Sequence, residues 1–183
     1  MRTLTKLNSV AVFCGASSGA LPVWAEAAAE LGRGLGDRGI RLVYGGGSVG
    51  LMGTVANAAM ASGGDVIGVI PEFLTRREVA HHGVSNLEVT DSMHTRKMRM
   101  FNLSDAFVSF AGGLGTLDET FEILTWKQLG QHNKPILVCD VAGSAHALLG
   151  AIEASISMGF ARPEIRDLYE VVTSVPALLD RIG

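Results

Sequence analysis

The chain is poor in the features that mark several large classes of protein. It has only two cysteines among its 183 residues, Cys14 and Cys139, which argues against a disulfide framework and for a reducing compartment. No apolar stretch approaches the roughly 20 residues that a membrane-spanning helix needs. Residues 1–9 also lack the apolar core of a signal peptide. We therefore expect a cytoplasmic protein with no membrane partner.

The chain also has little net charge, because its 15 basic and 18 acidic residues nearly balance. The formal net charge is only −3, so no broad basic field would attract nucleic acid. His81 and His82 have no cluster of further ligands at metal-binding spacing, so no metal site is expected. Aromatic residues make up 6% of the chain and hydrophobic residues 48%, a balance typical of an α/β protein. The length fits one domain, residues 1–183, with a sizeable core.

Apolar runs that resemble buried strands alternate with helical patterns along the chain. Continuous apolar strands separated by helices predict a doubly wound parallel sheet, Rossmann-like, with helices on both faces. In such folds ligands bind beyond the carboxyl ends of the strands. We expect strands at residues 9–14, 40–44, 65–70, 87–90, 106–110, 135–139 and 169–173. We expect helices at 22–37, 49–61, 92–103, 116–129, 144–158 and 176–182, with short helical pieces in 72–85 and 163–168.

Three glycine-rich turns follow three of these strands, at residues 15–19, 45–53 and 112–115. The predicted topology brings all three to one edge of the sheet, which favours binding of a nucleotide or sugar phosphate. No turn continues into Gly-Lys-Ser/Thr, so none is a P-loop. The turn at 45–53 also lacks a suitably placed acid about 20 residues on, so a nicotinamide cofactor is not expected.

The third turn leads into a helix with acidic residues near its start. Thr116 and Glu119 have the spacing of a capping box, in which each side chain satisfies a backbone donor of the helix end. Asp118 could simply favour the helix dipole. Because the three glycine turns lie nearby, a catalytic role for Glu119 is the alternative, and the residue could serve both purposes.

A basic segment precedes this region. Arg96 and Lys97 lie near the start of a predicted helix, where cations oppose the helix dipole. A solvated charged face would account for them, but an anionic ligand or a nearby carboxylate explains them better. His94 fits a packed or exposed histidine better than a catalytic one.

With these motifs assembled, the chain resembles the LONELY GUY family of cytokinin-activating phosphoribohydrolases. Family members carry Pro-Gly-Gly-x-Gly-Thr-x-x-Glu, with Met-His-x-Arg-Lys upstream. This chain has Ala-Gly-Gly-Leu-Gly-Thr-Leu-Asp-Glu at 111–119 and Met-His-Thr-Arg-Lys at 93–97. The resemblance also covers 45–53 and 124–130. Ala111 replaces the motif's proline, and Asp118 replaces the commoner glutamate.

The resemblance implies hydrolysis of the N-glycosidic bond of an N6-substituted adenosine 5′-monophosphate, which yields free base and ribose 5-phosphate. It makes Arg96 and Glu119 the catalytic pair. It implies no metal, no cofactor and commonly a homodimer. The substrate-binding residues that it implies are Glu78, Arg96, Lys97, Gly113, Leu114, Gly115, Thr116, Leu117, Asp118, Glu119 and Thr125.

Other functions remain open from the residues alone. A plain AMP nucleosidase would differ only in a base pocket whose lining the sequence does not define. A nucleotide-binding module without catalysis is favoured only by Ala111. A pyridoxal phosphate decarboxylase would need a Schiff-base lysine. Of the four lysines, only Lys97 lies near the predicted site, and it belongs to the Arg-Lys motif.

Overall fold

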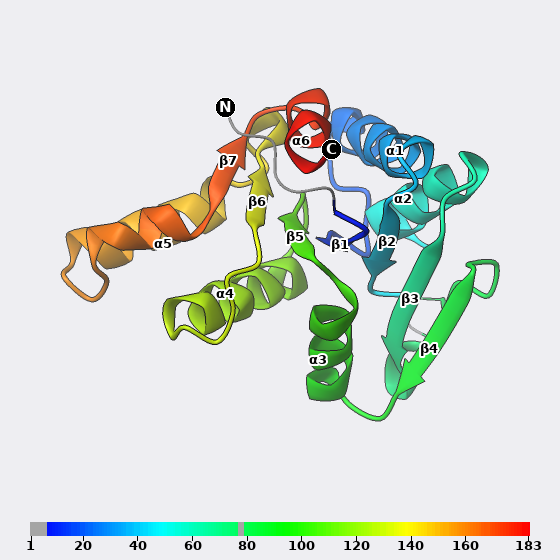
Figure 1. Ribbon diagram of the computed structural model, residues 1–183, viewed down its shortest axis with the longest axis horizontal. Coiled ribbons are helices and arrows are strands. Elements are labelled where there is room, and N and C mark those ends of the chain that lie inside the picture. Colours follow the sequence, from blue (N-terminus) through cyan, green and yellow to red (C-terminus); the bar gives the residue numbers. More distant parts are fainter. Residues whose placement is uncertain (1–6, 77–78) are drawn as a thin grey trace.

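A single parallel sheet forms the centre of the molecule (Figure 1). The computed structural model describes residues 7–76 and 79–183. Seven strands pair in the order β4-β3-β2-β1-β5-β6-β7, all parallel. This confirms the predicted fold class, and every strand lies within one residue of its expected bounds. The strands are β1 (Ser9–Phe13), β2 (Arg41–Tyr44), β3 (Val66–Pro71), β4 (Asn86–Thr90), β5 (Ala106–Ser109), β6 (Ile136–Cys139) and β7 (Glu170–Val172).

Helices cover both faces of the sheet. Side chains alternate along each strand, so Val12 of β1 joins one core cluster and Phe13 joins the other. Helices α1, α2 and α6 pack on the first face, and α3, α4 and α5 pack on the second. The helices are α1 (Pro22–Asp37), α2 (Gly50–Ala61), α3 (Met93–Leu103), α4 (Leu114–Gln128), α5 (His146–Ser157) and α6 (Val175–Ile182), with 3-10 turns η1 (Glu72–Leu74), η2 (Val141–Gly143) and η3 (Pro163–Leu168). Within the described ranges no helix is long and apolar enough to cross a bilayer.

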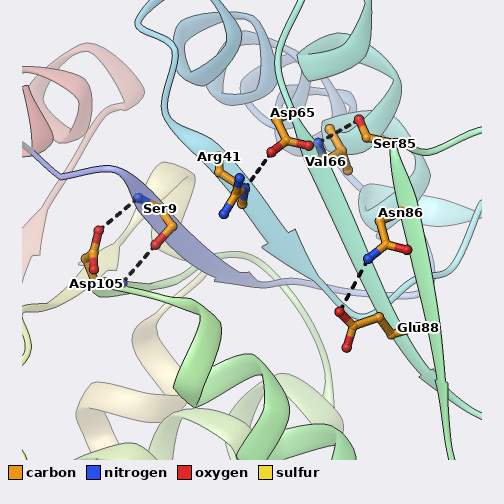
Figure 2. A network of polar contacts seen from close by, with 8 residues as sticks. All are labelled: Ser9, Arg41, Asp65, Val66, Ser85, Asn86, Glu88 and Asp105. Atoms are coloured by element: carbon orange, nitrogen blue, oxygen red, sulfur yellow. Dashed lines mark hydrogen bonds and ion pairs between the residues drawn. The ribbon is translucent and has the colours of Figure 1, made fainter.

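Polar contacts connect the amino-terminal ends of neighbouring strands. Figure 2 shows that Asp105, just before β5, accepts a hydrogen bond from the Ser9 N–H at the start of β1, with a nitrogen–oxygen distance of 3.1 Å. In return, the Asp105 N–H donates to the Ser9 hydroxyl at 3.2 Å. Arg41 at the start of β2 pairs with Asp65 beside β3. These contacts help to set the strand register at the edge opposite the carboxyl ends.

The strand order reverses between β1 and β5. The chain winds outward from β1 through β2 and β3 to β4, and then α3 returns it to β5 on the other side of β1. The segments after β1 and β5 therefore diverge, and the carboxyl ends of these two strands leave a crevice at the edge of the sheet. This is the position at which the sequence predicts ligand binding.

Candidate active site

The three glycine turns meet at the reversal point of the sheet. The Gly15 N–H donates to the Ala111 carbonyl at 2.9 Å, and the Met52 N–H donates to the Gly15 carbonyl at 3.1 Å. A Cβ at position 112 would collide with the Thr116 side chain and come within 3.0 Å of the Gly15 nitrogen. Only glycine fits at position 112. The predicted convergence of the three turns is confirmed.

These turns surround a cavity of about 360 Å³. It opens between the ends of β1, β2 and β5, the start of α4 and the side of α3. Its wall combines apolar groups, backbone amides of glycine turns and two charged side chains. The lining residues are Val12, Cys14, Gly15, Ala16, Ser17, Gly45, Met52, Arg96, Gly113, Gly115, Thr116 and Glu119.

Arg96 supplies positive charge to this cavity. It lies on α3, and only 4% of the residue is exposed. Its Nε donates to the Val69 carbonyl at 3.0 Å, and its Nη2 donates to the Gly45 carbonyl at 2.9 Å. Because both carbonyls belong to the sheet edge, the orientation of the guanidinium is set by the fold.

Glu119 supplies negative charge from the second turn of α4. The residue is 9% exposed and lines the cavity with Arg96. Cys14 lies in the same wall, and burial together with the charge of Glu119 raises the pKa of its thiol, while Arg96 acts in the opposite direction. Cys14 is therefore a neutral thiol at physiological pH, unsuited to act as a nucleophile.

The capping box predicted for Thr116 and Glu119 is wrong. Helix α4 begins at Leu114, with Gly113 at the N-cap position and no side-chain cap. Thr116 is therefore already inside the helix, because the glycine turn lets the chain enter helical geometry two residues early. Instead of capping, the Thr116 side chain packs over Gly112 and lines the cavity. Glu119 is likewise displaced from the capping position.

The cavity collects only part of the predicted set. Arg96, Gly113, Gly115, Thr116 and Glu119 line it. Glu78 lies outside the described residues.

The remaining predicted residues occupy other surroundings. Leu114 is 85% exposed, and Leu117 packs against the core beneath α4. Lys97 forms an ion pair with Asp118. Thr125 donates to the Phe121 carbonyl and borders a separate apolar hollow. Their contacts with substrate stay predictions.

Several lining residues were absent from the predicted set. Cys14, Ala16 and Ser17 follow β1, Gly45 follows β2, and Met52 belongs to α2. The glycine turns at 15–19 and 45–53 were the signal that could have found most of them. Met52 lies within the 45–53 segment, but its residue type gives no sign of a site, since a methionine in an apolar helix fits a core position equally well.

The described residues contain no group of three or more His, Cys, Asp or Glu side chains that could hold a metal ion. Nor does the described lining of the cavity include a lysine. Lys127 donates to the Lys134 carbonyl, and Lys134 donates to the Phe101 carbonyl. The described residues therefore do not fit a cofactor that binds as a Schiff base.

Comparison with known sequences identifies close relatives. The chain is 48% identical over 176 residues to a cytokinin riboside 5′-monophosphate phosphoribohydrolase of Rhodococcoides fascians, covering 96% of this chain and 89% of that protein. It is 41% identical over 182 residues to an Arabidopsis thaliana enzyme of the same name, covering 100% of this chain and 85% of the relative. A family model described as "possible lysine decarboxylase" matches residues 52–182.

Solved structures share the fold at lower sequence identity. A molybdenum cofactor binding protein from Rippkaea orientalis superposes with a TM-score of 0.71 at 23% identity, covering 98% of this chain and 95% of that chain. A molybdenum cofactor carrier protein from Chlamydomonas reinhardtii gives a TM-score of 0.69 at 23% identity, covering 96% and 94%. At this identity the likeness concerns the fold alone.

Proposed function

Since the chain belongs to the LONELY GUY family of cytokinin riboside 5′-monophosphate phosphoribohydrolases, we propose that its reaction takes place in the cavity between β1 and β5. The chain is an N-glycosidase that acts on a cytokinin nucleoside 5′-monophosphate. It releases the free base, and hydrolysis leaves ribose 5-phosphate as the second product. The observation that carries the assignment to this cavity is that Arg96 and Glu119 both line it, beside the start of α4, which has no side-chain cap.

The start of α4 is the proposed site for the 5′-phosphate. The first intrahelical bond of this end runs from the Leu117 N–H to the Gly113 carbonyl. The N–H groups of residues 114–116 precede that bond, so helix geometry leaves them as donors for a ligand. The positive end of the helix dipole adds to the attraction for an anion. Gly113 and Gly115 allow close approach because neither has a Cβ.

Glu119 is proposed to act at the anomeric carbon. Cleavage of a ribosyl C–N bond develops positive charge on the sugar, as in glycoside hydrolysis. A carboxylate beside the ribose stabilises that charge and can orient the attacking water. The fixed location of Glu119 on a helix supports this role, because a preorganised charge need not move during the reaction.

Arg96 is proposed to hold the ribose or the phosphate. Its guanidinium is anchored by the Val69 and Gly45 carbonyls, so it is oriented before the substrate binds. A planar cation held in this way can recognise an anionic or hydroxyl-bearing ligand with little loss of side-chain entropy.

A homodimer in the cytoplasm is also proposed. Phe160 and Met158 are 88% and 70% exposed, and Phe160 borders the apolar hollow of about 240 Å³ beside α4. Exposed apolar surface of this kind favours association. The two free, buried thiols fit a reducing compartment. Light scattering after size-exclusion chromatography should give twice the chain mass of 19.2 kDa, and a monomer would contradict the dimer.

Base release from isopentenyladenosine 5′-monophosphate and from AMP tests the function. We expect chromatography to show free base from the first substrate at a higher rate than from AMP. Faster turnover of AMP would indicate an AMP nucleosidase. Tight nucleotide binding without release of either base, by folded protein, would indicate a binding module.

A further inference from the structure

Lys97 connects the two helices that carry the charged residues of the cavity. Its Nζ lies 3.1 Å from Asp118 Oδ2 and 3.1 Å from Glu122 Oε2. Lys97 directly follows Arg96 on α3, and Asp118 directly precedes Glu119 on α4. Lys97, next to Arg96 on α3, therefore contacts one residue that precedes Glu119 and another that follows it on α4.

The bridge is shielded from solvent on the lysine side. The Lys97 side chain is 12% exposed, and that of Glu122 is 23% exposed. Lys97 and Glu119 also border a small apolar gap with Phe13, Phe107 and Trp126. The aliphatic stem of the lysine therefore packs toward aromatic side chains while its ammonium reaches the carboxylates. The Asp118 side chain is 58% exposed, so the contact with Glu122 is the more shielded half of the bridge and is more constrained than a surface ion pair.

The electrostatics keep this lysine charged. Burial opposes the charged form of Lys97, but hydrogen bonds and charges from Asp118 and Glu122 outweigh burial and raise its pKa above the ordinary value. Lys97 is not among the residues that line the main cavity. Its ammonium thus faces the carboxylates of Asp118 and Glu122 and does not line the cavity.

We propose that Lys97 is a positioning residue that sets Arg96 relative to Glu119 by joining α3 to α4 through Asp118 and Glu122. This inference rests on the proposed function of the cavity. It differs from direct substrate binding, which the family resemblance implies for Lys97. The two roles make opposite predictions for kcat and KM, because misplacement of a catalytic pair slows the chemical step, whereas loss of a substrate contact weakens binding.

The test compares Lys97→Met with Lys97→Arg. Methionine keeps the apolar stem but removes the charge, so we expect kcat to fall by about 10- to 100-fold with KM for isopentenyladenosine 5′-monophosphate within about threefold of wild type. Arginine keeps the charge and should restore kcat to within about threefold. If Lys97→Met does not fold, the double variant Asp118→Asn/Glu122→Gln removes the bridge from the other side, and the same fall in kcat is expected.

Arg99→Met is the matched control. Arg99 lies on the same helix and forms a two-point ion pair with Glu88 of β4, with bonds of 2.6 and 3.0 Å. The Arg99→Met change removes an ion pair between α3 and β4 and leaves the Lys97 bridge to α4 in place. We therefore expect kcat and KM to stay at wild-type values. A raised KM with unchanged kcat in Lys97→Met would overturn the proposal in favour of substrate binding. Wild-type kinetics in that variant or in the double variant would overturn it as well.

Amide hydrogen exchange provides a readout that does not depend on turnover. Removal of the bridge should speed exchange at the second turn of α4 and the first turns of α3, whereas Arg99→Met should leave α4 unchanged. Unchanged exchange in α4 after Lys97→Met would contradict the bridge. If wild-type protein releases no base, the proposed function fails while the exchange experiment still tests the bridge.

Discussion

The guanidinium of Arg96 occupies the space that a side chain at position 45 would need. Its Nη2 donates to the Gly45 carbonyl at 2.9 Å, and a Cβ on Gly45 would collide with that nitrogen and approach the Met52 sulfur. The glycine after β2 is thus required by an arginine 51 positions later in the chain.

Gly45→Ala should displace Arg96. The added methyl overpacks a buried site, so we expect a loss of about 1–3 kcal/mol in the free energy of unfolding and at least a tenfold fall in base release. Urea denaturation and chromatography measure the two effects. Gly150→Ala is the control, because nothing lies within 4 Å of a Cβ on Gly150 in α5. That change should be neutral or stabilising by up to about 1 kcal/mol. Full activity in Gly45→Ala would show that the position of Arg96 is not critical.

Arg96→Lys should not preserve activity. Arginine donates from two separate nitrogens to the Val69 and Gly45 carbonyls, and a single ammonium cannot match that fork. The buried carbonyls lose a donor, so we expect the free energy of unfolding to fall by about 1–3 kcal/mol and base release to drop at least tenfold. Arg41→Lys, in the exposed pair with Asp65, should change neither. Near-normal rates in Arg96→Lys would mean that charge alone suffices.

Glu119→Gln should abolish most of the chemistry and leave binding. Removal of a carboxylate that stabilises charge or orients water lowers kcat by about 10²- to 10⁴-fold, with KM little changed. Steady-state kinetics on isopentenyladenosine 5′-monophosphate measure both constants. Glu153→Gln, in the exposed pair with Arg166, is the control and should keep wild-type kinetics. A rise in KM without loss of kcat would assign Glu119 to binding instead.

Alkaline pH should destabilise the folded protein. Burial raises the pKa of the Cys139 thiol from 9.0 to about 12, and it also raises the pKa values of Cys14 and Tyr44. The unfolded chain therefore releases protons above pH 9 that the folded chain retains, so stability is lost as pH rises from about 9 to about 12. Each group contributes up to about 1.4 kcal/mol per pH unit. Urea denaturation from pH 7.5 to 10.5 should show this decline, with a smaller slope in Cys139→Ala. A free energy of unfolding that stays constant over this pH range would contradict the raised pKa values.

Much of the fold follows from local patterns. The strand and helix bounds were predictable because buried parallel strands are continuous apolar runs, and a glycine follows most of the helices within two residues. The convergence of the three glycine turns was predictable as well, since the carboxyl ends of parallel strands share one edge. The first residue of α4, in contrast, could not be predicted from the sequence pattern. Thr116 has the spacing of a cap, but the preceding glycines let the helix begin at Leu114.

The sheet, the glycine turns and the acidic and basic motifs could be predicted from the amino-acid sequence, because they depend on residue type and spacing along the chain. The different contacts of the neighbours Arg96 and Lys97 could be seen only in the folded protein. Successive residues on a helix point about 100° apart. Arg96 therefore meets the sheet edge and the cavity, whereas Lys97 meets Asp118 and Glu122 on α4. That difference depends on where α4 lies in space, which spacing along the chain does not specify.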